Sequence, residues 1–542
     1  MERHLTDASG RVRPTRRLPA AVILLVSAGL ALAGCAASAD GGAGSGPDAT
    51  PVKGGVLHYR AAGGGKSIDP AAATGYGLTV PLRALVDSLV FNNQDGSFAP
   101  WLATKWEVND NATRYTFTLR EDVTFSNGEK LDAAAVKASY QALRDNGAKY
   151  AVANQWIGAL KEITTPSPYT VVFDFSKPNS SFLQASSSSV LGIVAPATSA
   201  LPFEKRQEGL GIIGSGAFVA AESRGEEGYT LTRREDYRWP PAPAKNQGPA
   251  HLDKIEVRNI QDNSIAAAEL RAGGLDLLHN TEPADKTEFA SSSEITIRRD
   301  PLPGSALGFA ANLKVPGLDD VKVRRALSLA IDRDAVLKRA SAIDVAPKSA
   351  YTASNPYAPD QSDKIRTDVA EAKKLLDEAG WKPGANGVRE KNGDKLSFTL
   401  VYSPSTISHE PNIAVVQSQW KDIGVELKFG SLTQAELNQR VLSGNYSFTW
   451  GSGTRPDADV LRSTYGGKDP ELDRIFDEIL AQPDFEARKA LAAKASEIVL
   501  TEAYYLPLYD FIQPLAYRNS THLPLFEATH VPWLGDAWVD QQ

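Results

Sequence analysis

The 542-residue chain contains one cysteine and one methionine. A single cysteine cannot form a disulfide within the chain, so the fold must be stabilised by its hydrophobic core. Hydrophobic residues make up 42% of the sequence and charged residues 23%, which is typical of globular proteins, and the length predicts two to four structural units at about 150 residues per domain. No apolar run reaches the roughly 20 residues that span a bilayer, which excludes a channel.

The sequence also lacks the common catalytic motifs. It contains neither a G-x-S-x-G nucleophile elbow nor an H-E-x-x-H zinc helix. The histidines show no spacing typical of a metal site, and His409-Glu410 stands alone. We therefore predict that the protein is not an enzyme and that it has no metal or cofactor of its own.

The chain also has no excess of positive charge. The formal net charge is −7, and it falls to −10 (53 basic against 63 acidic residues) without the first 34 residues. A negative chain is repelled by nucleic acid and by anionic lipid, so we expect neither as a direct partner.

The N-terminus has the features of an export signal. Four arginines between positions 11 and 17 precede an apolar stretch of about 14 residues, 20–33, which ends in small residues. This stretch is too short to span a bilayer comfortably. Arg16-Arg17 leaves twin-arginine export open beside the general secretory route.

The end of this signal resembles the bacterial lipobox. Leu32-Ala33-Gly34 precedes Cys35, the only cysteine. The resemblance implies a lipoprotein signal peptide at 1–34, a diacylglyceryl group on the Cys35 sulfur, and location on the outer face of the cytoplasmic membrane. Residues 35–54 are small and polar and predict a flexible tether. An ordinary secretory signal with an incidental cysteine is the alternative.

Hydrophobic periodicity predicts alternating strands and helices, and therefore an α/β fold. Asp132 is placed to cap a helix that runs to about Leu143. We expect strands at 56–60, 115–119, 169–175, 396–402 and 425–429, and further helices at 322–339, 369–379, 412–423, 472–481 and 485–502.

Six segments, in order, resemble the peptide/nickel group (family 5) of ABC-transporter solute-binding proteins. They are Pro100-Trp101-Leu102-Ala103 with 115–128, Gly214-Ser215-Gly216-Ala217-Phe218 with 231–238, 266–276, 320–333, 372–381, and Tyr504-Tyr505-Leu506-Pro507-Leu508-Tyr509. Each motif alone is weakly specific, but six in register behind a lipobox are strongly specific.

The resemblance implies a two-lobed periplasmic-binding-protein clamp of class II, cluster C type, that closes over a ligand by a hinge motion. We expect a larger lobe from 55–95, 205–300 and 500–542. An extra subdomain would occupy 96–204, and a second lobe would occupy 301–499.

The family also implies where the ligand lies. A stretch late in the second lobe lines the cleft, here 446–461. Classical peptide binders have a Trp followed three residues later by an Asp that pairs with the ligand's α-ammonium. Here Gly453 stands three residues after Trp450, Thr454 takes the acid's place if one insertion is allowed, and Asp457 aligns best with a second acid.

The chemistry of these residues suits a polar ligand. Trp450 and Tyr446 offer aromatic surface, Arg455 a donor fork for a carboxylate or a phosphate, and Asp457 or Asp459 an acceptor for an amine. A local salt bridge is the alternative for Arg455 and Asp457. Asp69, in a loop that resembles a cleft-facing family loop, is a further candidate, with turn formation as its alternative.

The resemblance implies a monomeric, membrane-tethered component of an ABC importer that delivers a small solute to permease subunits. An oligopeptide or dipeptide is the expected solute. A metal chelate, haem, an opine, an antibiotic or an oligosaccharide stays open, because this fold hosts them all. A sensory lipoprotein is a further alternative.

Overall fold

The computed structural model describes residues 50–61, 67–72, 75–208, 210–279, 281–403 and 410–540. The predicted signal peptide, Cys35 and the tether up to residue 49 lie outside these residues. Within them, no helix combines the length and the apolar character needed to cross a membrane. The α/β fold class is confirmed, and we keep the names larger lobe, subdomain and second lobe for the predicted ranges.

The larger lobe is built on a seven-stranded mixed sheet. Its spatial order is β12 (Ile295–Ile297), β21 (Leu515–Arg518), β11 (Leu277–His279), β1 (Val56–Ala61), β10 (Lys254–Asn259), β9 (Gly228–Arg233) and β8 (Phe218–Ser223). β1 runs parallel to both β10 and β11. The associated helices are α1 (Tyr76–Arg83), α7 (Asn263–Ala272) and α8 (Pro283–Phe289). Short strand pairs are β2 (Val90–Asn92) with β3 (Phe98–Pro100), and β22 (Thr521–His522) with β23 (Trp538–Val539).

The subdomain is an antiparallel four-stranded sheet covered by helices. Its order is β4 (Ala103–Val108), β5 (Arg114–Leu119), β7 (Thr170–Phe175) and β6 (Leu160–Ser167). The helices are α2 (Ala133–Asp145), α3 (Ala151–Ile157), α4 (Phe182–Ser187), α5 (Pro196–Ser199) and α6 (Phe203–Arg206). Asp132 caps α2 as predicted, accepting a hydrogen bond from the Ala135 amide at 2.9 Å. α2 buries Val136, Tyr140 and Leu143, which share one helical face.

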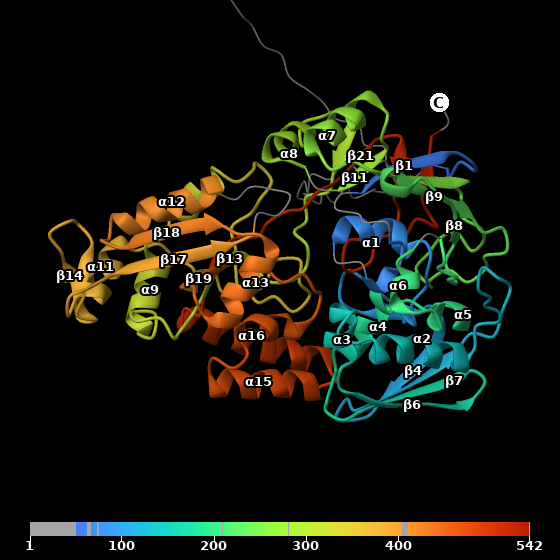
Figure 1. The fold of residues 1–542 in the computed structure, drawn as a ribbon, viewed down its shortest axis with the longest axis horizontal. Helices are drawn as coiled ribbons and strands as arrows, with labels where there is room; N and C mark the ends of the chain where they lie inside the picture. The colour runs from blue at the N-terminus through green and yellow to red at the C-terminus, as the bar shows by residue number, and fades with distance from the viewer. Residues whose placement is uncertain are drawn as a thin grey trace, which may run out of the picture. The chain divides into compact units, whose positions relative to one another are not determined.

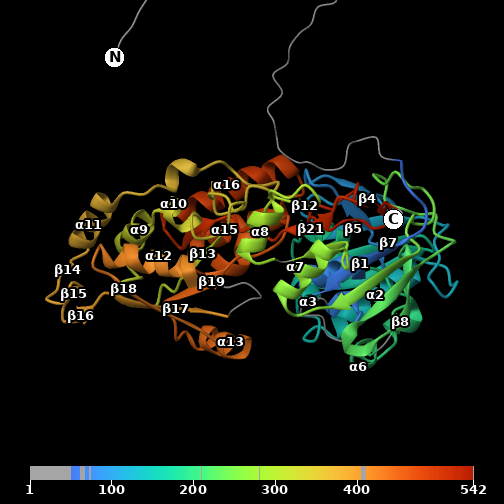
Figure 2. The same ribbon diagram turned by 90° about the horizontal axis from the view of Figure 1, so that it is seen from above.

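The second lobe contains a five-stranded mixed sheet in the order β18 (Glu426–Ser431), β17 (Ser397–Tyr402), β19 (Phe448–Gly451), β13 (Leu307–Ala311) and β20 (Tyr505–Tyr509). Its helices are α9 (Val321–Leu329), α10 (Arg333–Leu337), α11 (Val369–Glu378), α12 (Glu410–Lys421), α13 (Gln434–Ser443), α14 (Arg462–Tyr465), α15 (Pro470–Ala481) and α16 (Phe485–Thr501). A small sheet joins β14 (Lys382–Pro383), β15 (Arg389–Lys391) and β16 (Asp394–Lys395). α13 buries none of its residues and projects from the rest of the lobe (Figure 2).

The second-lobe sheet is buried on both faces. Alternate residues of β13 point to opposite sides, so Phe309 joins a core with Trp420 of α12, whereas Ala310 joins a core with Leu472 of α15 and Val499 of α16. In contrast, one continuous core runs through the larger lobe and the subdomain, from Leu57 to Phe117. The subdomain and the larger lobe are therefore held together by apolar packing. The second lobe has two cores of its own, and its Ile343 joins a further core of the larger lobe with Leu278 and Phe289.

Two segments cross between the seven-stranded and five-stranded sheets, 298–306 and 510–514. The sequence assigned 500–542 to the larger lobe, but β20 pairs with β13 in the second lobe. The chain therefore crosses after Tyr509 and not before residue 500. The other lobe boundaries stay a prediction.

The predicted strands are confirmed as β1, β5, β7, β17 and β18, and most predicted helices are found within one to three residues at either end. The single helix expected at 322–339 is wrong, because the chain forms two helices there, α9 and α10. Asp332 adopts an extended conformation between them and accepts a hydrogen bond from the Ala335 amide at 3.1 Å, so it starts a new helix.

Candidate functional site

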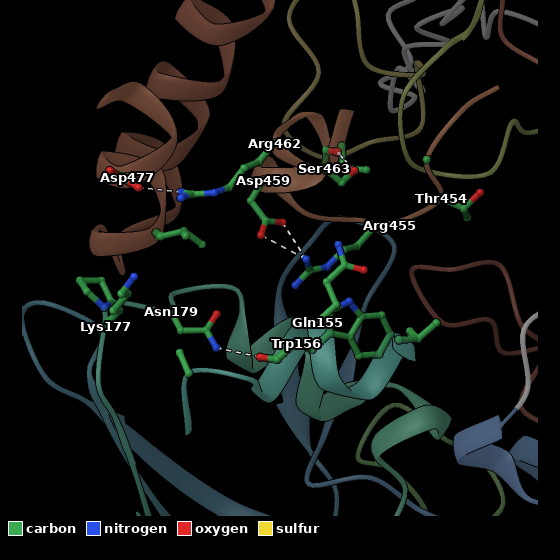
Figure 3. A pocket seen from close by; sticks show the side chains of 16 residues that line it. Gln155, Trp156, Lys177, Asn179, Thr454, Arg455, Asp459, Arg462, Ser463 and Asp477 are labelled. Carbon is green, nitrogen blue, oxygen red and sulfur yellow. Dashed lines mark hydrogen bonds and ion pairs between the residues drawn. The ribbon is translucent and has the colours of Figure 1, made fainter. Parts of the chain in front are cut away.

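A pocket with a volume of about 930 Å³ lies between the subdomain and the second lobe (Figure 3). One wall comes from α3 and the turn 177–179, and carries Gln155, Trp156, Lys177 and Asn179. The other comes from 453–463 and α15, and carries Thr454, Arg455, Asp459, Arg462, Ser463 and Asp477. Figure 1 shows α15 and α16 beside α3 and α4, segments far apart in the sequence.

Arg455 connects the two walls. Its Nε donates a hydrogen bond of 2.7 Å to Gln184 Oε1 of the subdomain, and its Nη1 lies 2.9 Å from Asp459 Oδ1. The guanidinium also lies 5.4 Å from the centre of a Trp156 ring, within the range of a cation–π contact. Arg455 is thus held by one aromatic ring, one amide and one carboxylate.

The pocket wall carries charges of both signs in pairs. Arg455 pairs with Asp459, and Arg462 pairs with Asp477 at 2.8 Å. Burial raises the pKa of Asp459 to about 6, and the neighbouring Asp457 carboxylate adds to this, although Arg455 acts against it. Asp459 is therefore ionised at neutral pH and takes up a proton in mild acid.

Asp457 lies behind the wall and not on it. Its side chain is 1% exposed, with Oδ1 2.6 Å from Arg488 Nη2 and accepting a hydrogen bond from Ser181 Oγ at 2.8 Å. Oδ1 also accepts a bond from the Asp459 amide, which caps the 3₁₀ helix η5 (Ala458–Leu461). Burial would raise the pKa of Asp457, but the Arg488 and Arg455 guanidiniums outweigh it and hold the pKa below its usual range.

Thr454 is exposed in the pocket, and its position is set by the backbone. Residues 453–454 pair with the crossing segment, since Thr454 bridges to Gly304 and the Gly453 amide donates to Ser305 Oγ at 2.7 Å. A Cβ on Gly304 would lie 1.9 Å from the Gly453 carbonyl oxygen, so only glycine fits there. Thr454, which stands where classical peptide binders have the acid, is therefore held in place by the crossing segment.

Trp450 and Tyr446 lie on or beside β19, away from the wall of this pocket. Trp450 is half-buried, with its ring centre 5.5 Å from that of Phe309 and 6.4 Å from that of Tyr509. Tyr446 is half-buried, its pKa is raised by burial, and its carbonyl accepts a bond from Asn312 Nδ2 at 2.9 Å. Trp450 therefore packs against the core of the second lobe.

Asp69 is also distant from the pocket wall. It is 1% exposed, and its Oδ1 accepts a hydrogen bond from Arg206 Nη2 at 2.8 Å. Its Oδ2 accepts a bond of 2.8 Å from the Tyr150 hydroxyl. These partners enclose the carboxylate, and the same enclosure applies to Asp457, which argues against direct contact of either acid with a ligand.

Of the six residues predicted to bind the ligand, the structure brings Thr454 and Arg455 to the pocket. Sequence reasoning missed the whole opposite wall, including Gln155, Trp156 and Asn179. The Gln155-Trp156 pair on a short helix was the only signal, and it does not distinguish a pocket wall from surface. The structure does not describe Cys35, so its lipidation stays a prediction.

The pocket lies between two walls from different parts of an α/β clamp, which is typical of proteins that bind small solutes. Among the residues that the structure describes, no cluster could hold a metal ion. The model of the bacterial extracellular solute-binding proteins, family 5, matches residues 97–471. The chain belongs to this family, whose members are binding proteins of ABC transporters and not enzymes.

Individual relatives agree with this assignment. The nickel-binding periplasmic protein of Escherichia coli is 27% identical over 478 residues, 80% of this chain and 85% of its own length. The crystal structure of NikA from Brucella suis in complex with Fe(III)-EDTA has a TM-score of 0.75 at 24% identity, covering 90% of this chain and 100% of that one. AppA from Bacillus subtilis, in complex with a nonapeptide, has a TM-score of 0.71 at 22% identity, covering 91% and 100%.

The burial of Asp457 leads to a prediction about stability. Replacing Arg488 with Leu leaves a buried carboxylate without its cation, so we expect a loss of about 3–5 kcal/mol in the free energy of unfolding. Arg474→Leu, which removes the exposed pair with Glu478, is the control and should cost less than about 1 kcal/mol. Urea unfolding followed by circular dichroism measures both, and equal losses would contradict the assigned role of Asp457.

Proposed function

We propose that this protein is the lipid-anchored solute-binding component of an ABC importer, and that its solute is a short peptide held between α3 and the segment 453–463. The observation that carries the proposal is the Arg455–Asp459 pair on the pocket wall, with Trp156 beneath the guanidinium.

A dipeptide is a zwitterion whose two charges lie close together, and this pair offers a partner of opposite charge to each of them. The planar guanidinium of Arg455 can donate two hydrogen bonds to a carboxylate, and the Asp459 carboxylate attracts an ammonium group. When a zwitterion binds, Arg455 exchanges the Asp459 carboxylate for the ligand's carboxylate, and Asp459 exchanges the Arg455 guanidinium for the ligand's ammonium group. Neither charge is then left unpaired in a half-buried site. A ligand of net charge would leave one member of the pair without a partner.

The walls also leave room for side chains of different sizes. Gln155, Asn179 and Ser463 offer polar groups, and a cavity of about 930 Å³ holds water beside a small peptide. One relative is crystallised with a nonapeptide, which supports a peptide ligand, and another with Fe(III)-EDTA. An anionic chelate is the second candidate, because Lys177 adds a third cation to the pocket.

A screen on the chain from residue 36 onward tests the proposal, because every described helix, strand and core lies beyond residue 49. We expect dipeptides with free termini to raise the melting temperature by mass action, and termini blocked on both sides to abolish the shift. Arg455→Ala should weaken binding at least tenfold, whereas Arg474→Ala, the control at an exposed pair that does not line the pocket, should change it about twofold at most. A shift with Fe(III)-EDTA and with no peptide would reject the peptide assignment.

The raised pKa of Asp459 predicts a pH dependence. A carboxyl with a pKa of about 6 is ionised at pH 7.5 and mostly protonated at pH 5, where it no longer attracts an ammonium group. Peptide affinity, measured by isothermal titration calorimetry, should fall about fivefold or more between these two pH values. Asp459→Asn should bind weakly with no such slope; a variant as pH-dependent as the wild type would exclude Asp459 from the site.

Membrane tethering depends on Cys35. Two acyl chains on a lipobox cysteine give stable anchoring, so the full chain expressed in a bacterial host should remain in the membrane fraction and incorporate labelled fatty acid. Cys35→Ser should abolish the label and prevent lipoprotein processing. A full chain that is unlabelled and recovered in the extracellular or periplasmic fraction would favour an ordinary secretory signal.

A further inference from the structure

Part of the contact between the subdomain and the second lobe is made by buried polar groups, although each side is built on an apolar core. Ser180 and Ser181 precede α4 in the subdomain, and both are buried. Across the interface lie the end of α15, the start of η5, and Arg488 of α16. These residues form the contact that we call the serine latch: Ser180, Ser181, Ile479, Leu480, Asp457 and Arg488.

Three hydrogen bonds of the latch have short distances. The Ser180 amide donates to the Leu480 carbonyl at 2.8 Å, and its hydroxyl donates to the Ile479 carbonyl at 2.6 Å. The Ser181 hydroxyl donates to Asp457 Oδ1 at 2.8 Å. Each bond has its donor in the subdomain and its acceptor in the second lobe.

The charges of the latch both belong to the second lobe. Asp457 and Arg488 are paired at 2.6 Å, and Tyr357, also of the second lobe, is bonded to Arg488 Nη1 at 3.0 Å. If the subdomain moves away, this ion pair stays intact, and the serine hydroxyls and the two carbonyls are exposed to water. Separation at the latch therefore leaves no charge of the latch unpaired, whereas separating an ion pair there would cost far more.

From this arrangement we infer that the serine latch stabilises the closed clamp without a solute. The larger lobe moves with the subdomain because they share one hydrophobic core, so the latch joins the two bodies that the crossing segments 298–306 and 510–514 connect. The latch also reaches the pocket, because Asp457 caps the segment that presents Asp459 and follows Arg455. Solute binding then adds to an existing closed population and does not create it.

The test measures the distance between subdomain and second lobe in solute-free protein. The chain from residue 36 has no cysteine, so spin labels at Lys161→Cys and Lys489→Cys, both exposed, report one distance by pulsed electron resonance. We expect a closed component in the wild type. Ser181→Ala should lower the closed-to-open ratio about tenfold, because it removes a hydrogen bond to a charged group.

Ser186→Ala is the matched control, since this buried serine of the same helix bonds only locally, to the Leu183 carbonyl at 2.8 Å. It should leave the ratio unchanged. Ser180→Ala, which removes the bond to Ile479, is a second latch variant and should act like Ser181→Ala if the latter does not fold. Two results would overturn the inference. One is a wild type with no closed component, and the other is a closed-to-open ratio in the latch variants equal to that of the wild type or of Ser186→Ala. Because no solute is present, this result is independent of the peptide assignment.

Discussion

The buried contact between Asp457 and Arg488 determines the shape of one side of the molecule. Asp457 accepts bonds from Arg488, from Ser181 and from the backbone at Asp459, so one carboxylate holds a helix, a loop and a neighbouring subdomain. A group this buried depends on its cation for stability. The pocket wall from 453 to 463 and the contact with α4 both follow from this one pair.

The subdomain has structural roles in both halves of the clamp. It shares the apolar core of the larger lobe, supplies the Trp156 wall of the pocket, and at the serine latch meets the second lobe through polar groups that water can replace. An apolar seam would resist opening, because its exposure to water costs free energy in proportion to area. A polar seam is compatible with a clamp that opens and closes in each cycle of solute delivery.

The sequence predicted the α/β class, the family and most helices and strands, since these depend on local periodicity and on motifs in order. The break between α9 and α10 was missed because Asp332 fits a helical pattern as well as a cap. The family resemblance drew attention to the segment with Thr454 and Arg455, which lines the pocket, and its contact with a ligand stays a prediction. Trp156 could not be anticipated, because only folding brings α3 beside η5. The sequence could not place Asp457 behind the wall, since the same carboxylate suits a ligand or a buried arginine.

The central claim is that solute lies between Trp156 and the Arg455–Asp459 pair. A crystal structure with a bound peptide tests this most directly. The account predicts that the peptide carboxylate lies within about 3 Å of the Arg455 guanidinium and the ammonium within about 3 Å of Asp459, with the Arg455–Asp459 contact lengthened. A peptide bound elsewhere, with Arg455 still paired to Asp459 and resting on Trp156, would contradict it.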